Sequence, residues 1–386
     1  MESFDFLEPS FLPDELLMLR DGLRRFVSSE IIPRADAWEI SGFVPREIFS
    51  RMGELGYLGM RHEEQYGGSG LGPLASVILA EELSRSGYGG FASSVLVHTD
   101  MSVSHISRRG TPEQKQRFLP AVCRGEKIGA ICVTEAHAGS DVSAIRTTAR
   151  REGDSWVING SKMFITNGAN ADIYIVAART HTEAKPSRSL SLFILEKDMP
   201  GLQVARKLDK HGWRSSDTAE LFFDDVRVPA QNLLGEEGTG FYGIMATFQD
   251  ERVVVGAMCT GQMARGLELT LDYVRARKAF GKTLWEQQAT RQRLANYAAK
   301  AAAARSLVYM AAQIHAEGRE CVREVSMVKA YTPELAHEVL HGCLQLHGGT
   351  GYMTGTHIER MVRDNRVLTI GGGATEVMLE EIAKRI

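Results

Sequence analysis

The sequence predicts a mainly α-helical protein with a central β segment, because the spacing of its apolar residues and helix breakers changes twice along the 386 residues. Up to about residue 126, apolar residues recur at intervals of three and four, as on one face of a helix. From about 127 to 236, short β-branched and aromatic runs stand between Gly, Pro, Asn and Asp. Beyond about 240, long segments contain few helix breakers. We therefore expect three domains: 1–126 helical, 127–236 mostly β, and 237–386 a helical bundle.

Local patterns predict the individual elements. In the first zone helical spacing runs through Leu16, Leu23 and Phe26 and continues over Leu74–Leu83, ahead of a serine- and glycine-rich break at 84–94. In the second zone the expected strands are Ser155–Gly160, which enters a turn, and Ile173–Ala178, Ser189–Leu195 and Leu221–Val228. In the third zone we expect long helices over Ala289–Ala316 and Val322–Leu346.

Composition excludes several classes of protein. With 45 Lys and Arg against 48 Asp and Glu, the net charge of −3 leaves no basic excess for nucleic acid. Charge or glycine interrupts every apolar stretch before the roughly 18–20 residues of a membrane span. The acidic N-terminus does not resemble a signal peptide, and the five cysteines form no CxxC pair. We therefore expect a cytoplasmic protein, although a processed mitochondrial matrix protein would look the same.

Three familiar motifs are present only in weak form. His337 and His341 match HExxH, but Arg360 stands where the third zinc ligand would be, so we expect a polar helix face and no metal. Gly281-Lys282-Thr283 resembles the end of a P-loop, yet Ala276 replaces the first glycine of that motif. No GxGxxG follows a strand, so a Rossmann nucleotide site is not indicated.

Three stretches rich in small residues are stronger candidates for a ligand site. Residues 132–141, CVTEAHAGSD, combine hydroxyls with small side chains that let backbone amides approach a ligand closely. Residues 163–168, MFITNG, place Phe164 and Thr166 two positions apart and hence on one face of a strand. Residues 345–352, QLHGGTGY, end a helix in glycine.

Together with RKAFGK at 277–282, these motifs resemble the acyl-CoA dehydrogenase family, in order, at family-like separations and over essentially the whole chain. One departure is Gly355, which stands where the family usually has an acidic residue. The resemblance implies an N-terminal helical domain, a middle β-barrel or sandwich domain and a C-terminal four-helix bundle. It also implies an FAD enzyme that converts an acyl-CoA thioester to its trans-2-enoyl product and passes electrons to an electron-transfer flavoprotein.

The resemblance further implies where FAD binds. Val133 and Thr134 would meet the pyrimidine side of the isoalloxazine, Thr166 would bond near N5, and Phe164 would pack on the ring. Ser140 would lie between the pyrophosphate and the pantetheine. A neighbouring subunit would hold the adenylate half, which implies a homo-oligomer similar to a dimer of dimers. The residues that would do so are Arg277, Phe280, Gln288, Gln345 and Gly349, with Thr375 and Glu376 closing the site. The full set of cofactor residues expected on this basis is Cys132, Val133, Thr134, Gly139, Ser140, Phe164, Ile165, Thr166, Arg277, Phe280, Gln288, Gln345, Leu346, Gly348, Gly349, Thr375 and Glu376.

The reaction needs a carboxylate that removes the proton alpha to the thioester, while the carbonyl oxygen accepts hydrogen bonds. Many family members carry this glutamate in the loop before the last helix, where this chain has Gly372. The long-chain and isovaleryl-CoA members carry it on a helix, where this chain has Glu251. Glu251 is therefore the expected base, and Gly372 N–H is expected on the thioester oxygen. By the same resemblance, the expected substrate-binding residues are Ser140, Phe248, Asp250, Arg252 and Gly372.

Two other functions stay open at this point. One is a relative that uses oxygen, such as an acyl-CoA oxidase or a nitroalkane oxidase, although the latter tends to have aspartate where this chain has Glu251. The other is a non-catalytic subunit that binds FAD inside a mixed complex. The length and branching of the acyl group are not indicated.

Overall fold

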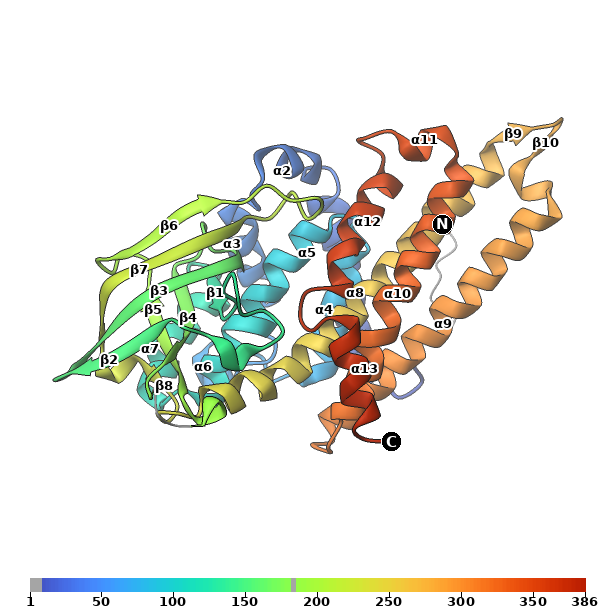
Figure 1. The fold of residues 1–386 in the computed structure, drawn as a ribbon. Coiled ribbons are helices and arrows are strands. Elements are labelled where there is room, and N and C mark those ends of the chain that lie inside the picture. Colours follow the sequence, from blue (N-terminus) through green and yellow to red (C-terminus); the bar gives the residue numbers. More distant parts are fainter. Residues whose placement is uncertain (1–8, 182–184) are drawn as a thin grey trace.

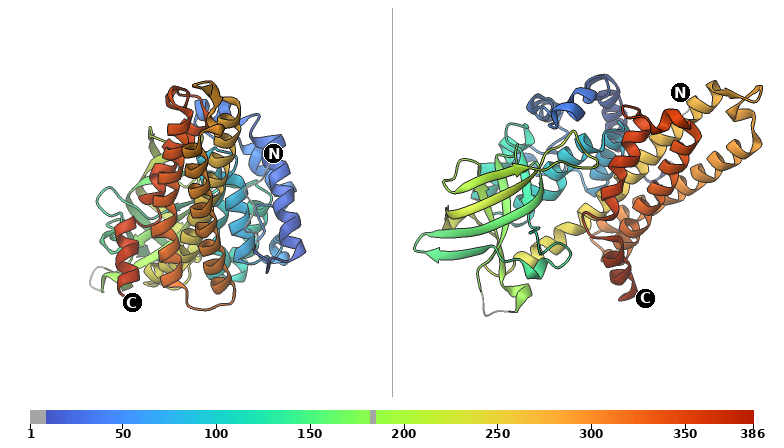
Figure 2. Two further views of the ribbon diagram at one scale, coloured as in Figure 1. Left: turned by 90° about the vertical axis from the view of Figure 1, so that its right-hand side faces the viewer. Right: turned by 45° about the horizontal axis from the view of Figure 1, so that its top comes forward.

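The computed structural model describes residues 9–181 and 185–386. Helices of the first and last thirds of the chain lie side by side, and a β domain from the middle third packs at one end of them (Figure 1). Turned views show the long C-terminal helices standing beside the N-terminal ones (Figure 2). Among the described residues, no helix has both the length and the apolar character that crossing a bilayer requires.

The N-terminal third is helical, as expected. Its helices are α1 (Asp14–Phe26), α2 (Ala35–Ser41), α3 (Arg46–Glu54), α4 (Pro73–Ser84), α5 (Gly89–Leu96), α6 (Ser104–Arg109) and α7 (Pro112–Cys123). Two π-helical turns, η1 (Val27–Ile31) and η3 (Val97–Ser102), continue α1 and α5.

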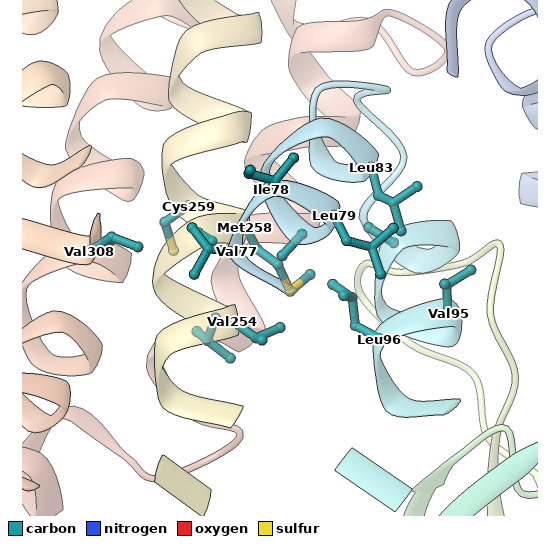
Figure 3. Close-up of a cluster of buried hydrophobic side chains, with 14 of the residues drawn as sticks. Val77, Ile78, Leu79, Leu83, Val95, Leu96, Val254, Met258, Cys259 and Val308 are labelled. Carbon is teal, nitrogen blue, oxygen red and sulfur yellow. The ribbon is translucent and has the colours of Figure 1, made fainter. Parts of the chain in front are cut away.

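Helices α4 and α5 form the centre of the helical core. Every residue of α4 from Ala75 to Ser84 is buried, and so is all of α5. Their side chains meet those of α8 and α9, including Val254, Met258 and Val308 (Figure 3). The expected break at 84–94 is therefore wrong in its second half, where Gly89–Leu96 is helical. A helix that is buried all round has no polar face and hence no amphipathic period.

In the described residues of the middle third, one eight-stranded sheet has the order β6-β7-β3-β2-β4-β5-β8, with β1 paired to β4. Only Thr148↔Arg179 joins β2 to β4, so the sheet divides there into two halves. A buried cluster contains Ile158 and Leu221 of one half and Val176 and Phe193 of the other, which gives the β domain a two-layered core. The strands are β1 (Gly129–Cys132), β2 (Thr148–Glu152), β3 (Ser155–Thr166), β4 (Ile173–Arg179), β5 (Leu190–Glu196), β6 (Leu202–Lys207), β7 (Thr218–Pro229) and β8 (Leu233–Leu234).

Strand β4 shows how this domain is attached to the helices. Tyr174 and Val176 lie in the core of the sheet, whereas Ile173 and Ile175 belong to a second cluster with Phe118 of α7. Alternate residues of the strand thus face two different cores. A run buried on both faces is continuously apolar, as β4 is.

The four expected strands are present, but Ser155–Gly160 does not end in a turn. Strand β3 continues through Gly160 to Thr166. Gly160 has φ of 144°, and a Cβ there would stand 2.6 Å from Thr147 Oγ1, so this glycine permits a close backbone approach and no reversal. The sequence did not predict β1, β2, β6 and the two-residue β8. In β6 five of the six residues are exposed, so no apolar alternation marks the strand.

The C-terminal third contains three long helices, three shorter ones and a small hairpin. Five of these helices are α8 (Gly240–Ala276), α9 (Gln288–Ala316), α10 (Val322–His347), α12 (His357–Asn365) and α13 (Thr375–Ala383). The expected long helices correspond to α9 and α10, while α12 and α13 follow one another along α10 (Figure 1). A hairpin of β9 (Lys278–Ala279) and β10 (Lys282–Thr283) joins α8 to α9. The short helix α11 (Gly349–Tyr352) follows α10.

Candidate active site

Two segments far apart in sequence meet at the expected base. Glu251 lies on α8, and Gly372 lies in the turn that precedes α13. A Cβ atom on Gly372 would stand 2.7 Å from Glu251 Oε1. Gly372 has φ of 69°, in the left-handed region that glycine adopts without strain. Only a residue without a side chain fits here, which leaves room for the glutamate carried by α8.

The surroundings of Glu251 favour proton transfer. Burial raises the pKa of its carboxyl above the usual range, although the charges of Arg252 and Lys329 oppose that rise. A carboxylate with a raised pKa is a stronger base, which is what removal of a weakly acidic C–H proton requires. In the described part of the chain, the N–H of Gly372 donates to no backbone carbonyl. A carboxylate and an N–H group without a backbone acceptor therefore lie side by side.

Arg252 follows the base on α8 and is buried, with only 6% of its surface exposed. Its Nε has no hydrogen-bond partner among the described residues. The same Nε would lie 3.9 Å from a Cβ on Gly373, so the arginine faces the turn next to Gly372. A buried guanidinium nitrogen without a hydrogen-bond partner is costly, and it suits an anionic or carbonyl ligand at this place.

The loop of the CVTEAHAGSD motif is fixed to β3 by a buried ion pair. Lys162 donates from Nζ to Val133 O at 3.0 Å and to Glu135 Oε1 at 2.8 Å. Met163 N donates to Thr134 O at 2.9 Å. Burial lowers the pKa of Lys162 to about 8, and Glu135 acts in the opposite direction. Lys162 and Met163 of β3 thus fix the backbone carbonyls of Val133 and Thr134.

Sequence reasoning did not find Lys162 or Glu135 as supports of this loop. The sequence gives no signal for this role of Lys162, because only the fold shows that this lysine of β3 is fully buried. Glu135 also accepts from the backbone N–H groups of Arg146 and Thr147, at 2.7 and 2.9 Å.

Phe164 and Thr166 occupy an irregular part of β3. The pairing with β7 shifts register between Lys162 and Ile165, and Phe164 has φ of 63°. The expectation that Phe164 and Thr166 lie on one face rested on regular strand alternation, and this part of β3 is not regular. Ile165 is buried, whereas Phe164 is 63% exposed. An aromatic ring displayed in a backbone conformation rare for its residue type indicates a functional constraint.

Arg277 and Phe280, expected at the adenylate half, lie at the opposite end of α8 from Glu251, whereas Thr375 and Glu376 follow Gly372 at the start of α13. Arg277 and Phe280 belong to the β9–β10 hairpin, which projects beyond the helices (Figure 1). From Glu251 to the end of α8 is about 38 Å at the helical rise of 1.5 Å per residue. Arg277 and Phe280 therefore lie far from Glu251 of the same chain.

Several of the expected cofactor residues are free to receive a ligand. Phe280 is 98% exposed at the tip of the hairpin, with φ of 55°. Among the residues that the structure describes, a Cβ on Gly139, Gly348 or Gly349 would meet nothing within 4 Å. An exposed aromatic ring and open glycines are both suited to contact with a flat, partly apolar cofactor. The other expected residues divide between exposed Ser140, Arg277, Gln288, Gln345 and Glu376, partly buried Thr134, Thr166, Leu346 and Thr375, and buried Cys132, Val133 and Ile165.

Asp250, expected at the substrate, lies instead in a buried ion cluster. Its Oδ1 accepts from His315 Nε2 at 2.6 Å and from Arg61 at 3.0 Å, and its Oδ2 forms an ion pair with Arg108. Arg61 also reaches the buried carboxylate of Asp100. Because protein cations occupy both oxygens, this carboxylate has a structural role here, and its contact with a substrate stays a prediction.

Phe248, Thr375 and Glu376 complete the placement. Phe248 is one turn before Glu251 and packs against the apolar cluster that includes Val133, so α8 contacts the loop that follows β1. Thr375 donates to Glu334 Oε1 at 3.1 Å, and Glu376 is exposed in the first turn of α13.

The rings of His337 and His341 lie 4.3 Å apart, and no third potential metal ligand joins them among the residues described.

Three family models match the chain in order. They describe the acyl-CoA dehydrogenase N-terminal domain, at residues 13–126, the middle domain, at 130–226, and the C-terminal domain, at 238–386. The chain belongs to the acyl-CoA dehydrogenase family. This is a family of oxidoreductases, and the resemblance noted in the motifs is confirmed. The three-domain fold expected from it is confirmed as well.

Individual relatives agree with this membership. The mitochondrial long-chain specific acyl-CoA dehydrogenase of Mus musculus is 40% identical over 370 residues, covering 96% of this chain and 86% of that protein. The crystal structure of an acyl-CoA dehydrogenase from Geobacillus kaustophilus has a TM-score of 0.93 and 42% identity, covering 97% of this chain and 99% of that one. A glutaryl-CoA dehydrogenase from Mycobacterium smegmatis, solved in complex with FADH2, has a TM-score of 0.92 and 29% identity over 98% of this chain and 96% of its own.

Proposed function

We propose that this protein is an FAD-dependent acyl-CoA dehydrogenase in which Glu251 removes the α-proton of the thioester. The observation that carries the proposal is the approach of Gly372 to Glu251 Oε1, at 2.7 Å for a Cβ. It places an unobstructed carboxylate beside a turn whose N–H is available. Burial raises the pKa of that carboxylate, in the direction that a C–H base needs.

In the proposed reaction the α C–H bond breaks and its proton passes to the carboxylate of Glu251. The N–H of Gly372 donates to the thioester oxygen, where negative charge develops. The β C–H bond then breaks, the double bond forms between the two carbons, and the hydride leaves with its electron pair. FAD, when bound, supplies the hydride acceptor at N5. Buried Arg252 would hold the CoA part of the substrate near the turn.

The cofactor assignment is supported by the two groups of residues described above. Val133, Thr134, Phe164 and Thr166 would hold the flavin ring, and the hairpin with Phe280 would hold the adenylate half of a cofactor in a neighbouring subunit. The length of α8 between Glu251 and that hairpin supports an oligomer, for which we propose the dimer of dimers that the family resemblance implies.

An electron-transfer flavoprotein is the proposed electron acceptor, also on the basis of the family resemblance. Release of hydrogen peroxide during turnover would indicate an oxidase instead. We propose a straight or branched acyl-CoA as substrate. Activity measured on a panel from butyryl to palmitoyl-CoA, with isovaleryl and citronellyl-CoA, would define the chain length and branching of the acyl group.

Anaerobic mixing with acyl-CoA tests the base. Glu251→Gln should bind the thioester and retain FAD, yet fail to bleach the flavin, because the amide accepts no proton. Glu380→Gln, which alters an exposed carboxylate on α13, is the matched control and should bleach at the normal rate. Normal reduction of the Glu251→Gln variant would show that another group is the base.

A further inference from the structure

Lys329 is a fully buried lysine of α10 whose ammonium group reaches the turn that carries Gly372. Its Nζ donates to Leu368 O and to Gly373 O, each at 2.7 Å. Neither acceptor belongs to α10. An ammonium group has three donors and no acceptor, and burying it is costly unless it is well bonded. These two carbonyls therefore fix the position of the lysine, and the lysine fixes the position of the two carbonyls.

The two acceptors enclose the segment that approaches the base. Leu368 lies in the 3₁₀ turn Arg366–Thr369, and Gly373 directly follows Gly372. Within the segment, Gly372 has φ of 69° and Gly373 has φ of 109°. Two successive residues in this region give a backbone with many alternative conformations unless outside contacts hold it. Backbone bonds from Ile370 and Gly371 to Val367 O hold only its first half.

Lys329 also contributes to the charge around Glu251. The charged or titratable groups that face the lysine are Glu251, Arg252 and Cys259 of α8 and Glu334 of α10. Burial raises the pKa of the Cys259 thiol to about 12, so this thiol is neutral. Burial lowers the pKa of Lys329 to about 8, while the charge of Glu251 acts in the opposite direction. At neutral pH the lysine therefore still carries most of its positive charge.

We propose that Lys329 is a positioning residue for proton abstraction: it fixes the turn 369–373 so that Gly372 faces Glu251, and its charge favours the ionised carboxylate. This inference rests on the proposed function, because it assigns Lys329 a task only if Glu251 is the base. Lys329 touches the turn and not the reacting atoms, so its effect passes through Gly372 and Glu251. A lysine that merely capped the 3₁₀ turn would have no influence on the ionisation of Glu251.

Amide hydrogen exchange on the purified protein tests the first half of the proposal without any substrate. Lys329→Met keeps a side chain of similar length and removes the donors and the charge. We expect exchange in residues 369–374 to accelerate about ten-fold or more, as for local opening made easier by 1.4 kcal/mol. Lys300→Met, at a lysine on α9 that pairs with Glu338 away from the site, is the control and should leave this segment unchanged.

The pH profile of flavin reduction by acyl-CoA tests the second half. Without the positive charge the ionised form of Glu251 is less favoured. The acid limb of the profile, where reduction slows as the pH falls, should therefore move to higher pH by about one unit. Lys329→Arg keeps the charge, and its limb should return toward that of the wild type. We also expect the limiting reduction rate of Lys329→Met to fall about ten-fold at equal FAD content, because misplacing a reacting group by less than 1 Å has effects of this order.

Unchanged exchange in residues 369–374 would overturn the positioning role. A slower rate with an unmoved acid limb would show that Lys329 only stabilises the fold. If Lys329→Met does not accumulate as folded protein, Lys329→Gln, which keeps an N–H donor and lacks the charge, is read by the same two measurements. Full activity of Glu251→Gln would remove the proposed base, whereas the exchange result would still decide whether Lys329 holds the turn.

Discussion

Glu251 Oε1 lies 2.7 Å from the place that a Cβ on Gly372 would occupy, although the two residues belong to α8 and to the turn before α13. The resemblance to the acyl-CoA dehydrogenase family implies that these two positions are the alternative places for the catalytic glutamate. Their contact explains why only one of them can carry a side chain here. A carboxylate from α8 already occupies the space into which a side chain at 372 would project.

Adding one methyl group at this contact should disturb the base. In Gly372→Ala the new Cβ would displace the Glu251 carboxyl, and φ of 69° would cost about 1–2 kcal/mol for a residue with a Cβ. We expect the rate of anaerobic flavin reduction to fall by about ten-fold or more while FAD stays bound.

Gly371→Ala provides the matched control from the same turn. Its nearest contact would be Val367 O at 3.7 Å, an ordinary van der Waals distance, and its φ is not in the left-handed region. We expect near-normal reduction for this variant. Equal losses in both variants would mean that general loosening of the turn, and not contact with Glu251, sets the rate.

The raised pKa of Glu251 predicts the pH dependence of the reaction. The base must be ionised, so activity should be lost as the pH falls through this pKa. Because burial raises the pKa, the acid limb of kcat/KM should lie above the value near 4.3 that is typical of a glutamate in water. Reduction rates measured across pH, at constant FAD content, check this. A limb at the ordinary carboxyl value would indicate a solvated base.

The ion cluster around Asp250 should contribute strongly to stability. Burial alone would raise the pKa of Asp250, but the bond to His315 and the charges of Arg61 and Arg108 outweigh it and lower the pKa to about 2. Asp250→Asn would leave His315 and Arg108 without their carboxylate partner, while Arg61 keeps its ion pair with Asp100. We expect a loss of about 3–5 kcal/mol in unfolding free energy, as when one partner of a buried ion pair is removed. Asp272→Asn, at an exposed position of α8, is the control and should change little.

The sign of the pH effect distinguishes this cluster from ordinary packing. The contribution of Asp250 is present above its unfolded pKa near 3.9 and is lost as the pH falls toward about 2. The bond with Asp250 raises the pKa of His315 to about 9, so its contribution is present below about 6.5 and is lost as the pH rises through 9. The difference in melting temperature between wild type and Asp250→Asn should therefore be larger at about pH 5.5 than above pH 9. A difference independent of pH would argue for lost packing.

The sequence was sufficient for the parts of this molecule that repeat a local pattern. Helices α9 and α10 were predictable from long stretches without breakers, and β4 and β5 from apolar runs bounded by turn residues. The family motifs were sufficient to choose Glu251 over Gly372 as the expected base. The structure adds that these two residues are in contact.

Other features depend on tertiary partners and leave no local signal. Helix α5 is buried all round, so its sequence has no amphipathic period. Lys329 and Lys162 look like ordinary surface lysines in the sequence, and only the fold shows that both are fully buried and bonded to carbonyls of functional turns. The aspartate beside the base was expected to face a ligand because nothing in the sequence indicated that Arg61, Arg108 and His315 converge on it.

The hairpin tip offers a test of the proposed oligomer. Phe280 exposes 98% of its surface at the end of β9, and such a ring is stabilised when a partner or ligand covers it. If the hairpin contacts a cofactor bound to a neighbouring subunit, Phe280→Ser should lower the FAD content of the purified protein by about ten-fold or more, the effect of losing about 1.4 kcal/mol. Ile40→Ser, which alters a side chain 89% exposed on α2, is the matched control and should keep its FAD. Light scattering after gel filtration would report the mass of each variant. Full FAD content and unchanged mass in Phe280→Ser would show that this ring takes no part in a shared cofactor site.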